Sequence, residues 1–194
     1  MRIIGDVHGN HADYLELISK RRHTIQVGDF GFNYDSLKEV DSNCHKIIGG
    51  NHDNYDIINN YPHFLGDYGN AELDNIKFFF VRGELSVDAH LRLEGVSWWR
   101  NEELSMGQAY QAIEQYEQSK PDFFISHGCP ASVVEHFITN PAKIIPSRTS
   151  QILQSMFEIH QPKFWIFGHH HNSKTIRVGN CYFYCLNELD FIDI

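Results

Sequence analysis

The chain has 194 residues, of which 42% are hydrophobic and 13% aromatic, a length and composition that suit one domain with a substantial core over residues 1–194. Its formal net charge is −9, with 16 lysines and arginines against 25 aspartates and glutamates. Because binding to a nucleic-acid backbone favours a basic surface, this charge argues against long nucleic acids as partners.

The four cysteines are best explained as reduced side chains. Cys181 and Cys185 lie on the same side of a strand-like run as Phe183, which predicts core packing. No signal-peptide pattern precedes the first predicted strand, and no apolar run reaches the ~20 residues of a membrane span. We therefore expect a cytoplasmic protein without membrane spans.

The first part of the chain alternates short apolar runs with helical patterns. We predict strands over residues 1–6, 24–27 and 46–48, and helices over residues 12–20 and 36–41. Ser36 is the expected N-cap of the second helix. This rhythm is typical of a parallel α/β sheet, in which ligands collect beyond the carboxyl ends of the strands.

The second part of the chain continues the pattern after an irregular stretch. We predict strands over residues 76–81, 122–126 and 163–167, and helices over residues 103–120, 132–138 and 147–160. Residues 86–99 are predicted as irregular or hairpin-like, and a loop rich in proline and lysine separates the last two helices. Residues 175–178, 181–186 and 189–192 are predicted as closing hairpins.

Polar residues follow five of the predicted strands, each group beside a glycine. They are Asp6, His8, Asp29, Asn51, His52, Asp53, His127, His169 and His171. On an extended backbone, Asp6 and His8 project to the same side and can aim a carboxylate and an imidazole at one metal ion. Asp29 is a candidate bridge between two divalent ions ~3.5–4 Å apart. Turn formation alone does not call for the histidines at these positions.

These residues fall, in chain order, into five blocks that span most of the sequence. The blocks are Gly5-Asp6-Val7-His8-Gly9, Gly28-Asp29, Gly50-Asn51-His52-Asp53, Ser126-His127-Gly128 and Gly168-His169-His170-His171. In these blocks the chain resembles the calcineurin-like metallophosphoesterases. The resemblance implies an α/β fold of four layers, with two mixed β-sheets packed together and flanked by helices.

The resemblance also implies a two-metal site and a reaction. It assigns one metal to Asp6, His8, Asp29 and His171, the second to Asp29, Asn51, His127 and His169, and no metal role to His170. The mixed nitrogen and oxygen donors suit Mn, Fe or Zn, with Mn the ion expected in vitro. A hydroxide shared by the two ions would attack phosphorus. His52 would donate toward the leaving oxygen, and Asp53 would orient His52.

The chain departs from the pattern of its phosphoprotein-phosphatase-like relatives at the second block. The first block is similar to that of Ser/Thr phosphoprotein phosphatases and bacterial dinucleoside-tetraphosphate hydrolases. In those branches an aspartate that pairs with the catalytic histidine stands at the position of Phe32, and a phosphate-binding arginine at that of Asn33. Arg82 or Arg92 is the candidate replacement for that arginine, because a guanidinium binds phosphate in a bidentate way.

Residues 86–105 resemble a segment of small bacterial and phage metallophosphoesterases whose substrate is undefined. Within it, Trp98 and Trp99 face opposite ways if the backbone is extended. We expect one of them in the core, while the other is a candidate platform for a base or an aryl group.

The sequence therefore predicts a metal-dependent phosphoesterase. Its expected substrates are phosphomonoesters, either of a small molecule or of a phosphoprotein. The alternatives are a phosphodiesterase or a hydrolase of nucleotides or dinucleoside polyphosphates. A non-catalytic metal-binding scaffold is the remaining alternative, against which the complete set of ligands counts. The oligomeric state stays open.

Overall fold

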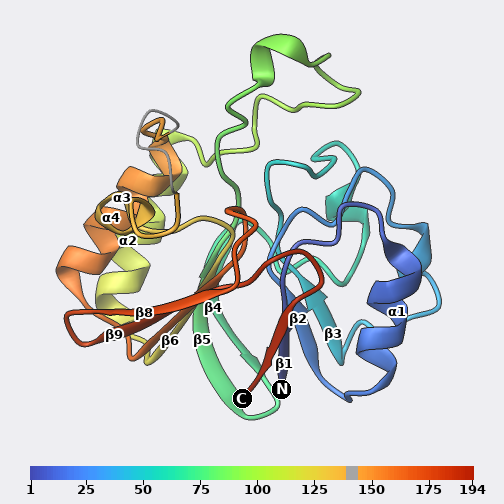
Figure 1. The fold of residues 1–194 in the computed structure, drawn as a ribbon, viewed down its shortest axis with the longest axis horizontal. Coiled ribbons are helices and arrows are strands. Elements are labelled where there is room, and N and C mark those ends of the chain that lie inside the picture. Colours follow the sequence, from blue (N-terminus) through green and yellow to red (C-terminus); the bar gives the residue numbers. More distant parts are fainter. Residues whose placement is uncertain (139–143) are drawn as a thin grey trace.

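Two β-sheets lie face to face in the computed structural model, which describes residues 1–138 and 144–194 (Figure 1). The first sheet has the strand order β10-β1-β2-β3. Its strands are β1 (Arg2–Ile4), β2 (Thr24–Gln26), β3 (His45–Ile47) and β10 (Phe191–Asp193). β1, β2 and β3 run parallel, as predicted, so their carboxyl ends share one edge of the sheet.

The second sheet has six strands in the order β4-β5-β6-β7-β9-β8. They are β4 (Tyr68–Leu73), β5 (Ile76–Val81), β6 (Phe123–Ser126), β7 (Phe164–Phe167), β8 (Lys174–Val178) and β9 (Cys181–Cys185). The four central strands β5, β6, β7 and β9 are parallel, and the edge strands β4 and β8 pair antiparallel with their neighbours. Both sheets are therefore mixed, which confirms the expected fold class.

The helices cover the outer faces of the two sheets (Figure 1). They are α1 (His11–Ser19), α2 (Met106–Ser119), α3 (Ala131–Val134) and α4 (Arg148–Ile159). Three 3₁₀ turns are also present: η1 (Asp35–Leu37), η2 (Ile58–Asn60) and η3 (Ala89–Leu91). Ser105 and Ser147 cap α2 and α4 through their side chains.

Successive side chains on each strand point to opposite faces of its sheet, and this alternation produces the four layers. On β1, Ile3 packs between the sheets, whereas Ile4 packs outward with Tyr14 of α1. On β5, Phe78 and Phe80 pack between the sheets, whereas Phe79 belongs to the core under α2 and α4. All of these side chains are almost fully buried, so strand register decides which of the layers each one fills.

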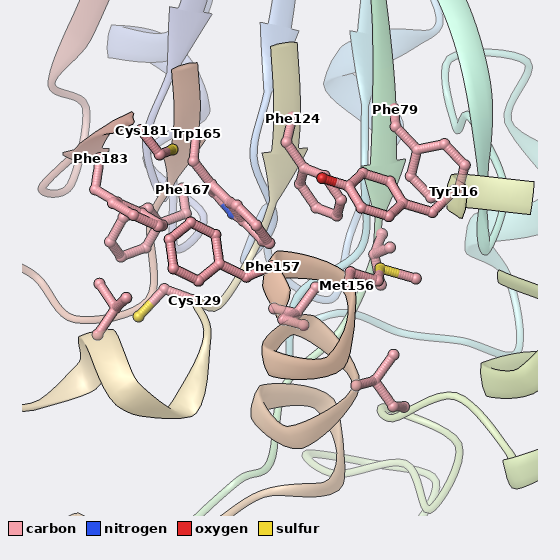
Figure 2. Close-up of a cluster of buried hydrophobic side chains, with 14 of the residues drawn as sticks. Phe79, Tyr116, Phe124, Cys129, Met156, Phe157, Trp165, Phe167, Cys181 and Phe183 are labelled. Carbon is pink, nitrogen blue, oxygen red and sulfur yellow. The ribbon is translucent and has the colours of Figure 1, made fainter. Parts of the chain in front are cut away.

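A row of aromatic side chains joins the second sheet to its helices (Figure 2). Phe79, Phe124, Trp165 and Phe183 occupy matching positions on the four central strands. The Phe124 and Trp165 rings stack with their centroids 3.9 Å apart. The Trp165 indole donates a hydrogen bond of 2.8 Å to Ser126, so the polar edge of this ring is satisfied inside the core. Cys181 is buried beside this row as a free thiol, in agreement with the predicted core packing.

Several elements differ from the sequence predictions. Strand β4 was not predicted, because the sequence from Tyr68 to Leu73 contains glycine, asparagine and glutamate and lies at an edge. The predicted helix over residues 36–41 is only the 3₁₀ turn η1, in which Leu37 is the buried side chain, and Ser36 lies inside the turn instead of capping it.

The last predicted hairpin is wrong as well, because β10 leaves the second sheet and pairs antiparallel with β1. Helix α3 ends at Val134, earlier than predicted. Residues 139–143 of the loop predicted after it lie outside the described residues. Among the residues that are described, we find no helix with the length and apolar character needed to cross a membrane.

Strand β10 is fastened to β1 by a buried arginine. Arg2 donates to both carboxylate oxygens of Asp193, at 2.9 and 3.1 Å, and Arg21 adds a contact of 2.6 Å. These hydrogen bonds hold the pKa of the Asp193 carboxyl well below its usual range. The chain end is thereby held against the first sheet, which also orders the turn that leads to it.

We predict that Asp193→Asn lowers the free energy of unfolding by about 1–2 kcal/mol at neutral pH, between the values for exposed and buried ion pairs. Since the pKa of Asp193 is lower in the folded state, this stabilisation is full above the unfolded value of about 4 and is lost as the pH falls through the folded value. Urea unfolding at neutral and acid pH measures it. Asp122→Asn, which breaks an exposed pair with Lys163, is the matched control and should have a smaller effect.

Candidate metal centre

The five polar segments predicted from the sequence meet at one place, beyond the carboxyl ends of strands from both sheets. The first sheet contributes the residues that follow β1, β2 and β3, and the second sheet contributes those that follow β6 and β7. The backbone amide of His169, after β7, donates to the carboxylate of Asp6, after β1, at 3.1 Å. The side chains therefore converge from distant parts of the chain, as the α/β pattern predicted.

One group of four ligand-type side chains consists of Asp6, His8, Asp29 and His171. Their ligand atoms all lie within 4.8 Å of one another. The Nε2 atoms of His8 and His171 are 3.2 Å apart. His8 Nε2 is 3.7 Å from Oδ2 of Asp6 and 3.7 Å from Oδ2 of Asp29. Such separations are compatible with one cation at the centre, because ligand bonds to divalent transition metals are about 2.0–2.2 Å long.

A second group lies on the other side of Asp29. His127 Nε2 is 3.1 Å from Oδ1 of Asp29 and 3.1 Å from Oδ1 of Asn51. His169 Nδ1 is 3.0 Å from the same Asn51 oxygen. The two oxygens of Asp29 thus face different groups, Oδ2 toward the first and Oδ1 toward the second. This is the arrangement expected of a carboxylate that bridges two ions.

The chemistry of the second group fits a cation. The carbonyl oxygen of Val27 lies 3.0 Å from His127 Nδ1 and accepts a hydrogen bond from it, so that Nε2 faces Asp29 and Asn51. Burial alone would lower the pKa of His127, but the neighbouring Asp29 carboxylate and the more distant Asp6 raise it to about 10. The same imidazole lowers the pKa of Asp29 against the effect of burial. The Asp29 carboxylate therefore stabilises positive charge at this position, which a proton on His127 supplies in the metal-free protein and a metal ion bound at Nε2 could replace.

The backbone at these tips is held in an unusual conformation. His8, Asp29, His169 and His171 all have positive φ, between 47° and 65°. Residues other than glycine adopt this region at a cost, and such strain concentrates at functional sites. Val7 and His8 donate their amides to the carbonyl oxygen of Asp29, at 3.0 and 2.8 Å, which locks the first two tips together.

Glycines at the strand tips make room for the candidate ligands. A Cβ atom on Gly50 would lie 2.2 Å from Oδ1 of Asp29, and one on Gly168 would lie 2.1 Å from Oδ1 of Asp6. Both distances are far inside van der Waals contact. These two glycines are therefore required by the close approach of carboxylates as well as by the turns that the sequence suggested.

His52 lies next to both groups and has an unexpected partner. Its backbone amide donates to Oδ1 of Asp29 at 2.7 Å, and its ring centroid is 5.1 Å from that of His8. Its Nε2 atom lies 2.8 Å from Nη2 of Arg92. Burial lowers the pKa of His52, and the Arg92 guanidinium acts in the same direction against the Asp29 carboxylate.

Asp53 does not orient His52, which corrects the role expected for it. Its Oδ2 accepts from the amides of Asp29 and Gly50, at 2.9 and 2.7 Å, and its Oδ1 accepts from the Tyr34 hydroxyl at 2.8 Å. Burial and the nearby Asp29 raise the pKa of Asp53 to about 7. The buried carboxylate of Asp53 therefore links the segment that follows β2 to the segment that follows β3.

The two candidate phosphate-binding arginines differ in position. Arg82 is 4% exposed, forms an ion pair with Asp67, and donates to the carbonyl oxygens of Asn101 and Glu102. Its guanidinium also covers the ring of Tyr55. These contacts give Arg82 a structural role, so its prediction as a substrate residue is wrong. Arg92 instead lines the pocket above the two groups.

That pocket has a volume of about 430 Å³. Its described lining residues are Asp29, Asn51, His52, Leu85, Val87, Asp88, Arg92, Phe137, Ile138, His169, His170 and His171. Neither Trp98 nor Trp99 is among them. Trp99 is the core member of the pair and donates from its indole to Asp56 at 2.7 Å. Phe32 was not predicted as a neighbour of the site, yet its ring is nearly parallel to that of His52, with centroids 6.4 Å apart.

A sequence model of the calcineurin-like phosphoesterase family matches residues 2–173. Because this match covers most of the 194 residues, the chain belongs to the calcineurin-like phosphoesterase family. It is thus a metallophosphoesterase, a hydrolase of phosphoester bonds, as the sequence blocks indicated. A search of curated protein sequences found no match.

Solved structures with the same fold are distant in sequence. A phosphopantetheinyl hydrolase from Mycobacterium tuberculosis is 12% identical, with 96% of this chain and 89% of that chain aligned and a TM-score of 0.57. An anchor in the inner membrane complex of Plasmodium is 11% identical, with 96% of this chain and 71% of that chain aligned and a TM-score of 0.53. At these identities the likeness establishes the fold.

We predict that Asp53→Asn lowers the free energy of unfolding by about 1–3 kcal/mol, because an amide nitrogen would face backbone donors that now reach a carboxylate. Tyr34→Phe, which removes one donor, should cost less. Urea unfolding measures both. A stable Asp53→Asn protein whose activity is nevertheless lost would restore the direct role for Asp53.

Proposed function

We propose that this phosphoesterase hydrolyses phosphomonoesters, of a small molecule or a phosphoprotein, at a site that holds two divalent metal ions. The observation that carries the proposal is the Asp29 carboxylate, which presents one oxygen to each of two groups of ligand atoms. A shared carboxylate with terminal ligands on both sides is what two neighbouring ions require.

In this proposal the first ion is held by Asp6, His8, Asp29 and His171, and the second by Asp29, Asn51, His127 and His169. Nitrogen and oxygen donors without thiolate favour Mn, Fe or Zn. When bound, the two ions supply an activated water as nucleophile and positive charge for the phosphate oxygens.

His52 is the proposed proton donor to the leaving oxygen. It lines the pocket, and the hydrogen bond from its own amide to Asp29 fixes its distance from the ligand groups. In the free protein its Nε2 atom faces Arg92. A phosphoryl group in the pocket would accept from that guanidinium in place of His52, and its negative charge would favour protonation of His52, which could then donate the proton on Nε2 to the leaving oxygen.

Arg92 is the proposed phosphate-binding residue. The Nε and Nη2 atoms of Arg92 donate to the carboxylate of Asp88, at 2.7 and 2.9 Å, and its Nη1 atom donates to the carbonyl oxygen of Ser97 at 3.1 Å. A guanidinium held in this way has a fixed direction, which favours recognition of phosphate oxygens.

Phosphodiesters are the second class of candidate substrates, and nucleotides or dinucleoside polyphosphates are further candidates. Of the described residues that line the pocket, Arg92 alone is a lysine or arginine, and Asp88 offsets its charge. A diester carries less negative charge than a monoester and depends less on such a cation. The ratio of monoesterase to diesterase activity in the wild type distinguishes the two candidates.

We predict that Asp29→Asn and removal of metal by chelation each abolish hydrolysis of aryl phosphates, measured with added Mn²⁺. His52→Ala should lower kcat about 10²–10³-fold for alkyl phosphates, and less for 4-nitrophenyl phosphate, because a good leaving group needs little protonation. Full activity of Asp29→Asn would overturn the proposed site. An equal loss on both substrates would remove His52 from the role of proton donor.

We predict that Arg92→Ala raises KM for phosphomonoesters roughly 10–100-fold, as expected for the loss of a charge-assisted hydrogen bond. The effect on diesters should be smaller. Arg100→Ala is the matched control, because Arg100 lies on the same segment and pairs with Glu94 while being largely exposed. Steady-state kinetics on both ester classes measures the difference, and an Arg92→Ala protein that behaves like Arg100→Ala would contradict the assignment.

A further inference from the structure

The side chain of Asn51 has two different ends, and the structure gives each a separate environment. Its oxygen Oδ1 lies between His127 and His169, at 3.1 and 3.0 Å. Its nitrogen Nδ2 donates to the hydroxyl of Ser86 at 3.3 Å. Asn51 is 4% exposed, so water does not compete freely for either end. The orientation of this amide therefore depends on Ser86.

Ser86 is in turn bound by a buried carboxylate. Its amide donates to Oε1 of Glu102 at 2.7 Å, and its hydroxyl donates to Oε2 at 2.6 Å. Ser86 and Glu102 are 3% and 2% exposed. Burial raises the pKa of Glu102, and the two hydrogen bonds from Ser86 oppose that effect. The pairing of both carboxylate oxygens with one residue explains how an acidic side chain is accommodated here.

The direction of these hydrogen bonds follows from the groups involved. A carboxylate can only accept, so the single proton of the Ser86 hydroxyl goes to Glu102. The Ser86 oxygen can then only accept from Asn51, which places the amide nitrogen of Asn51 on this side. The amide oxygen is left facing the imidazoles. With the amide turned over, Asn51 would present N–H donors there and could not be a metal ligand.

We propose that Ser86 and Glu102 are positioning residues that fix the amide of Asn51 and thereby determine the affinity of the second metal position. This inference rests on the proposed two-ion site and names residues to which the sequence motifs gave no role. Outer partners of ligand side chains commonly change metal affinity by about 10–100-fold when they are removed.

The same pair closes the base of the segment that carries Arg92. Ser86 lies at the beginning of this segment and Glu102 at its end, while the part between them rises above the strand ends (Figure 1). Arg82 adds to the closure by donating to the carbonyl oxygens of Asn101 and Glu102, at 2.8 and 3.2 Å. The contact that orients Asn51 is thus also the contact that ties down the pocket segment.

The test is a calorimetric titration of the metal-free protein with Mn²⁺, for the wild type, Ser86→Ala and Glu102→Gln. We expect two equivalents in the wild type. In both variants one equivalent should keep its affinity, because the first group does not touch Ser86, and the other should weaken roughly 10–100-fold. Ser86→Thr keeps the hydroxyl and should restore much of the loss.

Glu103→Gln is the matched control. Glu103 is the neighbouring acid, but its carboxylate accepts from the amide and hydroxyl of Thr149 at 2.8 and 3.1 Å, away from Asn51. Its titration should match that of the wild type. Circular dichroism on each variant checks folding, and Ser86→Ala decides the question if Glu102→Gln does not fold.

The outcomes separate this inference from the proposed function. A wild type that binds fewer than two equivalents contradicts the two-ion site itself. Two equivalents of unchanged affinity in a folded Ser86→Ala protein overturn the positioning role. Equal weakening of both equivalents also overturns it, because that result indicates a general disturbance of the site. A positioning role predicts weaker binding only of the ion beside Asn51.

Discussion

The buried carboxylate of Asp29 is the constraint on which the rest of the site depends. It is 2% exposed and stands between two groups of acceptor atoms. Its backbone is held from two sides, because Asp53 binds its amide while Val7 and His8 donate to its carbonyl oxygen. With φ at 57°, the residue persists in this strained state only because so many contacts determine it. A buried carboxylate in this position is stabilised by positively charged groups or ions beside it.

The site also depends on how the two sheets pack. The carbonyl oxygen of Val27, after β2, accepts from His127, after β6, and thereby fixes an imidazole of the second sheet from the first. The amide of His169 reaches across in the same way to Asp6. Large side chains such as Phe78 and Phe80 fill the space between the sheets and set their separation. The packing of the core between the sheets therefore also determines the geometry of the candidate ligands.

The sequence predicted the parallel strands and their polar tips, because alternation, glycine and residue type are local signals. It did not predict which buried acid meets which donor. Asp53 follows His52 directly and suggested a partner for it, yet its carboxylate turns toward Tyr34 and two backbone amides. Strand β10 was misassigned for a similar reason, since pairing with β1 is a contact between the two ends of the chain.

Two adjacent acidic residues also show that the sequence does not predict the partners of a side chain. Glu102 and Glu103 are indistinguishable in sequence, but one is fastened to Ser86 beneath the site and the other to Thr149 of α4. Arg82 and Arg92 both looked like phosphate-binding residues, and burial against Tyr55 removes the first from that role. Side-chain direction over long sequence separations decides these assignments, and composition carries little of that information.

The charge of the proposed site explains how an acidic chain can bind a phosphate anion. The formal net charge is −9, and the one guanidinium among the described residues that line the pocket is paired with Asp88. Basic side chains therefore contribute little net charge at this point. Two divalent ions held by the carboxylates of Asp6 and Asp29 would leave the centre with about two positive charges, four from the ions less two from the ligands. Attraction for the substrate would then come from the ions, while Arg92 supplies direction.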